Sequence, residues 1–151
     1  MRATQAVNQR QKKVLPQKII KHFGGSLEGR TIAVWGLAFK PQTDDIREAP
    51  ALTLIDDLLA AGAVVQAHDP QAMPNVQTIY GKKVLLSDSM YGSVEGSDAL
   101  ALVTEWHEFR SPDFNRIKRI MREPNLFDGR NMWAPDELRE LGFFYTGIGR
   151  K

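Results

Sequence analysis

Residues 31–50, TIAVWGLAFKPQTDDIREAP, decide how the chain folds. The first five are apolar and partly β-branched, a pattern typical of a buried strand. Gly36 follows where the chain must turn sharply, and a polar loop then leads to Pro50, which suits the first position of a helix. A strand, a charged loop and a helix in this order place the loop at the carboxyl edge of an α/β sheet. We therefore expect the ligand site in this loop.

The segments after this stretch alternate between extended and helical patterns. Further strands are expected at residues 64–69, 84–86, 99–103, 125–127 and 143–145. Helices are expected at residues 51–62, 113–121 and 135–141, with a helical turn at 89–95 and a loop at 71–81. Alternating strands and helices with right-handed crossovers produce a parallel sheet with helices on both faces. The predicted fold class is therefore α/β, with a Rossmann-like, mostly parallel sheet.

A helix is expected before the sheet, at residues 4–23, where Gly24 and Gly25 end it. Pro16 should kink or restart this helix, because proline removes a backbone donor and clashes with the preceding turn. Residues 1–30 carry seven Lys or Arg and one Glu, whereas residues 31–151 carry thirteen Lys or Arg and seventeen Asp or Glu. A basic arm can bind nucleic acid. Because this one lacks interleaved aromatic residues and the remainder is acidic, we interpret it as a solvated helix face and expect no nucleic-acid partner. The basic residues of this face are Arg10, Lys12, Lys13, Lys18 and Lys21.

The composition is that of an ordinary globular domain. The chain has 151 residues, of which 42% are hydrophobic and 25% charged. It contains no cysteine and three scattered histidines, which excludes disulfides and thiolate metal sites and makes a metal cluster unexpected. No apolar run approaches the length of a membrane span and no signal peptide opens the chain. We therefore expect a cytoplasmic protein without a membrane partner.

Five motifs in the chain resemble those of one enzyme family. Residues 36–50, GLAFKPQTDDIREAP, are similar to the signature of the C-terminal, nucleotide-sugar-binding domain of the UDP-glucose/GDP-mannose dehydrogenase family. The resemblance continues in the same order through HDP (68–70), TEWHEF (104–109), FDGRN (127–131) and GIGR (147–150). Enzymes of this family are much longer, so the chain resembles only their last third. The resemblance implies a linker helix at residues 1–25 and a UDP-binding domain at residues 26–151.

The resemblance also implies roles for four residues. It assigns Lys40, Arg130 and the backbone of Phe39 to the nucleotide sugar, and Arg47 to the pyrophosphate of NAD. Position along the chain agrees for Lys40 and Arg130, because both follow expected strands and so lie at the same edge of a parallel sheet. A pyrophosphate needs such positive groups, since burying its charge unpaired is prohibitive.

Each of these cations has an alternative interpretation that needs no ligand. Lys40 can be an ordinary surface lysine, and Arg47 can pair with Asp44 or Asp45 of its own loop. Arg130 can pair with Asp128 or Asp136 and merely fix the turn.

Other polar or aromatic residues near the motifs are ambiguous. Asp69 can hold a ribose, as an acid at the end of a second strand often does, but the spaced glycines of a dinucleotide site are missing and a structural Asp-Pro turn is the preferred interpretation. Trp106 more often fills a core than contacts a base, and the role of Glu105 is open. Asp44 and Asp45 are expected to shape the loop and cap the following helix, while His68 and His107 are expected to have core or surface roles.

The family oxidises the primary alcohol of a sugar to a carboxylate by two hydride transfers to NAD, using a cysteine thiolate. This chain has no cysteine, so it holds no catalytic residue of that reaction. We expect part of an NAD-dependent nucleotide-sugar 6-dehydrogenase, inactive alone, with NAD bound mainly by an absent amino-terminal half. The expected partners are a UDP-sugar, that half and, at full length, further copies in a homo-oligomer. The alternatives are a dehydrogenase for another UDP- or GDP-linked sugar, or a stand-alone nucleotide-binding module.

Overall fold

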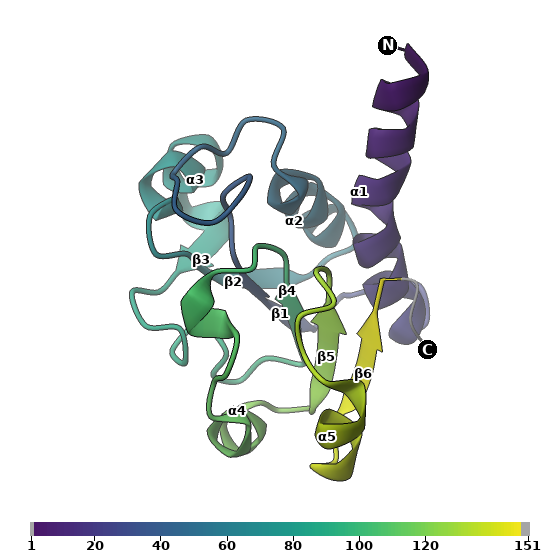
Figure 1. The fold of residues 1–151 in the computed structure, drawn as a ribbon, viewed down its shortest axis with the longest axis vertical. Helices are drawn as coiled ribbons and strands as arrows, with labels where there is room; N and C mark the ends of the chain where they lie inside the picture. Colours follow the sequence, from purple (N-terminus) through teal and green to yellow (C-terminus); the bar gives the residue numbers. More distant parts are fainter. Residues whose placement is uncertain (1, 149–151) are drawn as a thin grey trace.

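The computed structural model describes the backbone of residues 2–148 and the side chains of residues 11–148. It forms one six-stranded sheet in the order β3-β2-β1-β4-β5-β6, with every neighbouring pair parallel (Figure 1). The predicted Rossmann-like α/β fold is confirmed. The strands are β1 (Thr31–Trp35), β2 (Val64–His68), β3 (Val84–Leu86), β4 (Ala99–Leu102), β5 (Asn125–Asp128) and β6 (Phe144–Gly147).

Helices cover both faces of the sheet. The first three strands run from the centre to one edge and the last three to the other, so right-handed crossovers place α2 and α3 on one face and α4 and α5 on the other. Figure 1 shows these two pairs of helices well separated, with the sheet between them. The helices are α1 (Arg2–His22), α2 (Pro50–Ala60), α3 (Met73–Tyr80), α4 (Phe114–Ile120) and α5 (Pro135–Glu140), with 3₁₀ turns η1 (Gly81–Lys83) and η2 (His107–Phe109).

The register of the central strands brings distant segments to one edge. Trp35 at the end of β1 lies opposite His68 of β2 and Leu102 of β4, and Leu102 lies opposite Asp128 of β5. The residues that follow these four strand ends therefore meet at the carboxyl edge. The sheet beneath them is buried, because β4 and β5 are buried at every position and β1 at all but its first.

Two predicted turning points of the signature stretch are confirmed. Pro50 begins α2, as predicted. The predicted capping of this helix by Asp44 or Asp45 is wrong, because no side chain caps its first turn. Gly36 has φ of 94°, and a Cβ there would lie 2.5 Å from the Cβ of Thr104. This position therefore requires glycine for both its backbone conformation and its close approach to a neighbour.

The helix α1 runs through Pro16 as one element, so the predicted restart at that proline does not occur. Leu15 and Ile19 of α1 are buried in the core, which attaches its second half to the domain, while its first turns extend past the rest of the molecule (Figure 1). None of the helices in the described part of the chain is long and apolar enough to cross a membrane.

The prediction of a loop at residues 71–81 is wrong, because the chain forms α3 there. Pro74 is typical of a helix end in the sequence, but it lies in the first turn of α3. The N–H that proline lacks has no acceptor within the helix at that position. Val76 of α3 is buried, so packing on the sheet stabilises a helix too short to be recognised from periodicity. Residues 90–96 form consecutive hydrogen-bonded turns, and the Ser93 N–H donates to the Ser89 carbonyl at 3.1 Å, so the predicted helical turn at 89–95 is confirmed.

Candidate functional site

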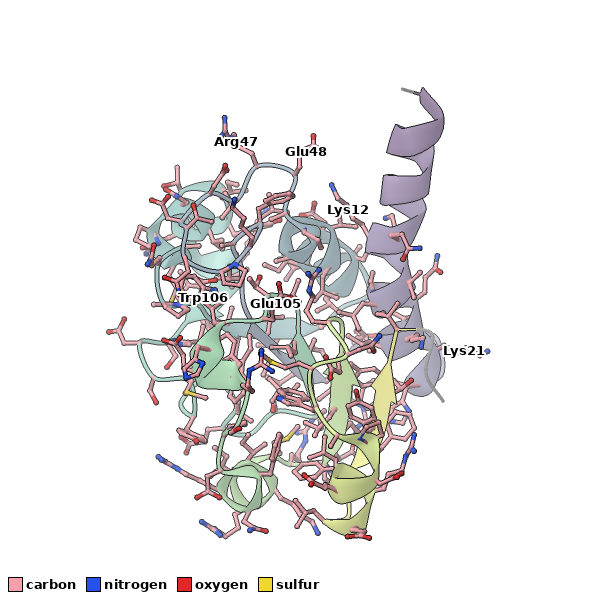
Figure 2. The ribbon with its side chains drawn as sticks, viewed as in Figure 1. Lys12, Lys21, Arg47, Glu48, Glu105 and Trp106 are labelled. Carbon is pink, nitrogen blue, oxygen red and sulfur yellow. The ribbon has the colours of Figure 1, made fainter. Side chains whose placement is uncertain are left out.

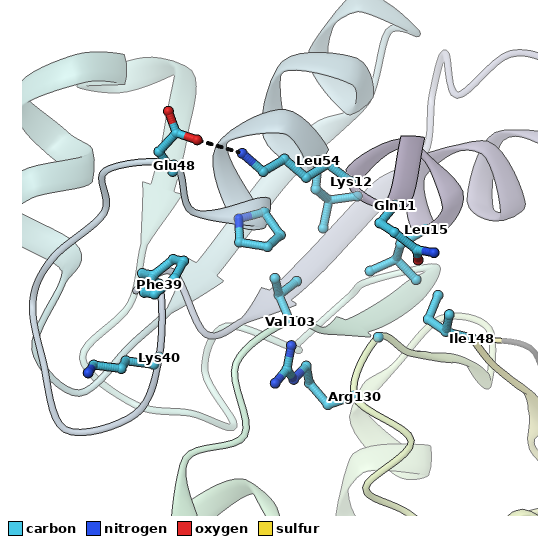
Figure 3. Close-up of a pocket in the computed structure, with 12 residues that line it drawn as sticks. Gln11, Lys12, Leu15, Phe39, Lys40, Glu48, Leu54, Val103, Arg130 and Ile148 are labelled. Atoms are coloured by element: carbon cyan, nitrogen blue, oxygen red, sulfur yellow. Dashed lines mark ion pairs between the residues drawn. The ribbon is translucent and has the colours of Figure 1, made fainter. Parts of the chain in front are cut away.

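A pocket of about 490 Å³ lies at the carboxyl edge, a size typical of small-molecule sites (Figure 3). Its walls come from α1, the loop after β1, the start of α2 and the segments after β4, β5 and β6. Apolar side chains form part of the lining: Leu15, Leu54, Val103 and Ile148. Three cations also line it, Lys12, Lys40 and Arg130, together with one carboxylate, Glu48.

Three of the four predicted site residues line this one pocket: Phe39, Lys40 and Arg130. Phe39 is held at its backbone, where its N–H donates to the carbonyl oxygen of Asp45 at 2.7 Å, while the residue as a whole is 53% exposed. The exposed ring is available to pack against a bound molecule. Asp45 therefore shapes the loop, as predicted.

The first part of the signature loop is fixed from below by a buried carboxylate. Asp69 is fully buried, and its Oδ2 accepts from the backbone N–H groups of Leu37 at 2.7 Å and Ala38 at 3.1 Å. Trp106 donates its indole N–H to the same oxygen at 3.1 Å, and Thr104 donates its hydroxyl to the Ala38 carbonyl at 2.7 Å. Lys40 thus lies two residues beyond a segment that these hydrogen bonds hold in place.

Asp69 and Trp106 consequently have structural roles. The other oxygen of Asp69 accepts from the backbone N–H groups of Gln71 and Ala72, both at 2.8 Å, which holds the turn before α3. With five donors on it, this carboxylate has no capacity left for a ribose, and the structural interpretation of Asp69 is correct. Trp106 is 3% exposed, so the preferred core role is also confirmed.

Arg130 reaches the pocket from the segment after β5. Its side chain pairs with Glu105, with Nη2 3.1 Å from Oε1 and Nε in contact with Oε2. The alternative that the side chain pairs with Asp128 or Asp136 is wrong. Asp128 instead accepts from the Arg130 backbone N–H at 3.1 Å and so shapes the turn that presents the guanidinium.

The sequence left the role of Glu105 open, and the register of β4 against β5 explains it. The segment after β4 runs beside the segment after β5, because the Gly129 N–H donates to the Leu102 carbonyl at 2.8 Å. Glu105 and Arg130 leave these two segments at the same edge and form a pair with two contacts, the geometry that carboxylates and guanidinium groups prefer.

Arg47, the predicted NAD ligand, lies outside the pocket lining. Its side chain is 88% exposed and points away from the rest of the molecule (Figure 2). It pairs with Asp45 through Nε at 3.0 Å and Nη2 at 2.9 Å, the loop ion pair considered as its alternative. Hydrogen bonds from Arg47 lower the pKa of Asp45 to about 2, and the same pair raises the pKa of Arg47.

Lys12 is the site residue that sequence reasoning missed. The interpretation of its helix face as solvated is wrong at this position, because the Lys12 side chain is 13% exposed and lines the pocket. Lys18, on the same helix, also turns inward and donates to the Gly147 carbonyl. Neither contact has a signal in the sequence, since the face of α1 that meets the domain is set by tertiary packing.

The histidines do not form a metal site. His68 is buried and its Nδ1 lies 2.8 Å from the Ser87 carbonyl oxygen, in agreement with a core role. No group of three or more potential ligand side chains gathers within the described part of the chain.

Comparisons with known proteins match almost the whole chain. The model of the UDP-glucose/GDP-mannose dehydrogenase family, UDP binding domain, matches residues 33–135. A UDP-glucose 6-dehydrogenase of Pseudomonas aeruginosa is 53% identical over 99% of this chain and 34% of its own length. One from Rhizobium meliloti is 42% identical over 97% of this chain and 33% of its own length. The solved structure of a UDP-glucose dehydrogenase from Pyrobaculum islandicum superposes with a TM-score of 0.82 at 29% identity, over 99% of this chain and 32% of that one. The chain thus spans about a third of the length of these relatives.

Proposed function

Because this chain belongs to the UDP-glucose/GDP-mannose dehydrogenase family, we propose that its pocket binds the nucleotide of a UDP-sugar. Relatives that are 53% and 42% identical are UDP-glucose 6-dehydrogenases. The chain would then act as the UDP-binding part of an NAD-dependent enzyme that oxidises UDP-glucose to UDP-glucuronate. The observation that carries the proposal is the meeting of Phe39, Lys40 and Arg130 around one pocket.

The chemistry of the lining supports a nucleotide diphosphate. Lys40 and Arg130 supply positive charge for the phosphates, whose burial without such partners would be prohibitively costly. Arg130 offers a planar fork of donors that suits paired oxygens better than the point charge of a lysine. The apolar part of the lining and the exposed ring of Phe39 suit the faces of the base and ribose.

NAD does not fit the carboxyl edge of this domain by itself. In dinucleotide-binding folds an acid after the second strand binds a ribose, but here five donors occupy Asp69. The loop after β1 also lacks the spaced glycines that let a pyrophosphate approach. We propose that NAD, which accepts the hydrides when bound, is held mainly by an amino-terminal half that this chain lacks. The exposed Arg47 would then exchange Asp45 for the pyrophosphate of NAD.

The chain is proposed to be inactive alone, because it contains no cysteine to form the covalent adduct that the second oxidation requires. Mixing it with UDP-glucose and NAD should give no absorbance of NADH. NADH formation that scales with the amount of chain, and survives further purification, would overturn this part of the proposal.

Titration calorimetry with UDP, GDP and NAD tests the proposed function. We expect saturable binding of UDP to the chain, weaker binding of GDP and no binding of NAD. Tighter binding of GDP would favour a dehydrogenase for a GDP-linked sugar. The absence of binding by either nucleotide would contradict the proposed function.

We also propose that the chain divides into a linker helix at residues 1–25 and a UDP-binding domain at residues 26–151. We further expect a homo-oligomer at full length, a cytoplasmic location and no nucleic-acid partner. The alternative of a stand-alone nucleotide-binding module differs from the proposed function in needing no second half. It would gain support if an added amino-terminal half left UDP affinity and activity unchanged.

A further inference from the structure

We propose that Lys12 of α1 is a third cation that binds the phosphates of the nucleotide, with Glu48 as its partner while the pocket is empty. The inference rests on the proposed function, because it assumes a nucleotide diphosphate in this pocket. It adds a helix outside the sheet to a site otherwise built from loops at the carboxyl edge. Figure 3 shows Lys12 reaching over the pocket from α1 and Arg130 approaching it from the opposite side.

The Lys12 side chain is 13% exposed, and its ammonium group is poorly paired. Its Nζ lies 3.7 Å from Oε2 of Glu48, which is beyond the length of a hydrogen bond. The described residues offer it no other charged partner within ion-pair distance. A lysine that lines an open pocket and lacks a close partner can obtain charge-assisted hydrogen bonds from an anion bound there.

The neighbouring lysine shows what a satisfied pair on the same helix looks like. Nζ of Lys13 lies 2.8 Å and 3.0 Å from the two carboxylate oxygens of Asp57 on α2. That pair links α1 to α2 and lies outside the pocket lining. Two consecutive lysines thus differ sharply, because Lys13 fixes the helix and Lys12 keeps donors for a ligand.

Glu48 is suited to release Lys12. Its side chain is 82% exposed, and a carboxylate so exposed loses little when a long, weak ion pair is broken. A diphosphate carries more charge than one carboxylate and approaches from the pocket side, where Lys40 and Arg130 already favour it. Binding would therefore exchange the Lys12–Glu48 contact for a Lys12–phosphate contact while Glu48 turns to solvent.

The test compares UDP with uridine, which lacks the phosphates, by titration into the 151-residue chain and its variants. Replacement of Lys12 by methionine (Lys12→Met) keeps the length of the side chain and should weaken UDP binding about tenfold while leaving uridine binding unchanged. Lys13→Met is the matched control and should leave UDP affinity unchanged even if it lowers the melting temperature. Glu48→Gln should strengthen UDP binding severalfold, because it removes the competing charge.

The outcomes separate this inference from the proposed function. Lys12→Met binding UDP within twofold of the wild type would overturn the inference and leave the function intact. An equal loss of UDP and uridine affinity would overturn it too, since Lys12 would then act through helix packing. If the wild-type chain does not bind UDP, both the function and the inference fail. Should Lys12→Met not fold, Lys12→Gln replaces it in the same titrations.

Discussion

Carboxylates are buried at both ends of the sheet, Asp69 and Asp128 at the carboxyl edge and Asp98 at the amino edge, and the two ends satisfy them in different ways. Asp69 at the carboxyl edge accepts five hydrogen bonds, from four backbone N–H groups and the indole of Trp106. Asp98 at the amino edge accepts from Nε of Arg122 at 2.7 Å and from the backbone N–H of Thr31 at 2.8 Å. Asp69 and Asp98 are both fully buried. Neutral donors thus satisfy Asp69 at the carboxyl edge, whereas an arginine helps to satisfy Asp98 at the amino edge.

The difference determines where cations are available for a ligand. At the amino edge Arg30 also pairs with Glu123 at 2.9 Å, so the charges there satisfy one another. At the carboxyl edge Lys40 makes no ion pair with any residue the structure describes, and Lys12 makes only the long contact with Glu48. Satisfying the buried acid with backbone groups thus leaves Lys40 and Lys12 without a close ion pair among the described residues.

The largest expected effect comes from replacing Asp69 by asparagine. The amide NH₂ would face backbone donors that now bind a carboxylate oxygen, and buried donors without a partner cost about 1–3 kcal/mol each. We expect the free energy of unfolding in urea to fall by about 3 kcal/mol. UDP affinity should fall as well, because the loop carrying Lys40 loses its support. Unchanged affinity of the folded variant would contradict a positioning role for Asp69.

The matched change at the other end is Asp98→Asn. It should lower the free energy of unfolding by about 2 kcal/mol at pH 7, the value of a hydrogen bond to a charged group. UDP affinity should stay within twofold of the wild type, because no nucleotide ligand is proposed at this edge. A large loss of UDP affinity would break the distinction between the two ends.

The Asp98 effect should also depend on pH. Burial raises the pKa of Asp98, but hydrogen bonds from Arg122 and the Thr31 backbone outweigh this and hold it below its usual 3.8. A carboxylate whose pKa is lowered by folding stabilises the protein at every pH above its unfolded-state pKa. This stabilisation is lost as the pH falls through the folded-state pKa. The stability difference between wild type and Asp98→Asn should therefore shrink only below about pH 3.8. Shrinkage already between pH 6 and pH 5 would contradict this pKa.

Arg130→Ala should weaken UDP binding roughly tenfold to a hundredfold, the equivalent of about 1.5–3 kcal/mol for a hydrogen bond to a charged group. Arg130→Lys should recover part of the loss, because charge returns without the planar fork. Stability should change little, since the pair with Glu105 is partly exposed. Arg122→Ala is the control at the amino edge and should lower the melting temperature without changing the affinity for UDP. Unchanged UDP affinity with a lowered melting temperature would make Arg130 a structural residue.

The smallest effect is expected for Arg47→Ala. In this chain it should change UDP affinity less than twofold and leave the melting temperature nearly unchanged, because the side chain is exposed. In an enzyme that includes the amino-terminal half, the same change should raise the KM for NAD. Equal losses of UDP affinity in both proteins would reassign Arg47 to the sugar nucleotide.

The sequence was sufficient for the parts of the fold that depend on local pattern. The apolar run at residues 31–35 predicted β1, and Pro50 predicted the start of α2. The meeting of Lys40 and Arg130 at one edge follows from the parallel pairing of the strands that precede them. The helix α3 was missed because its buried contact is a single valine, Val76, and its proline resembles a breaker.

The rest of the site depends on contacts that no local pattern encodes. Glu105 pairs with Arg130 only because β4 and β5 end level with each other. Lys12 enters the pocket because Leu15 and Ile19 fix which face of α1 meets the domain. Arg47 belongs to a motif, yet its side chain pairs with Asp45 of its own loop.

The most direct test of the contrast between the two ends is the amide NMR spectrum of the chain during titration with UDP. We predict that the backbone signals of Phe39, Lys40 and Gly129 shift in proportion to saturation, while those of Thr31, Asp98 and Arg122 do not. Shifts confined to the amino edge, or the absence of shifts at saturating UDP, would contradict the assignment of the nucleotide site to the carboxyl edge.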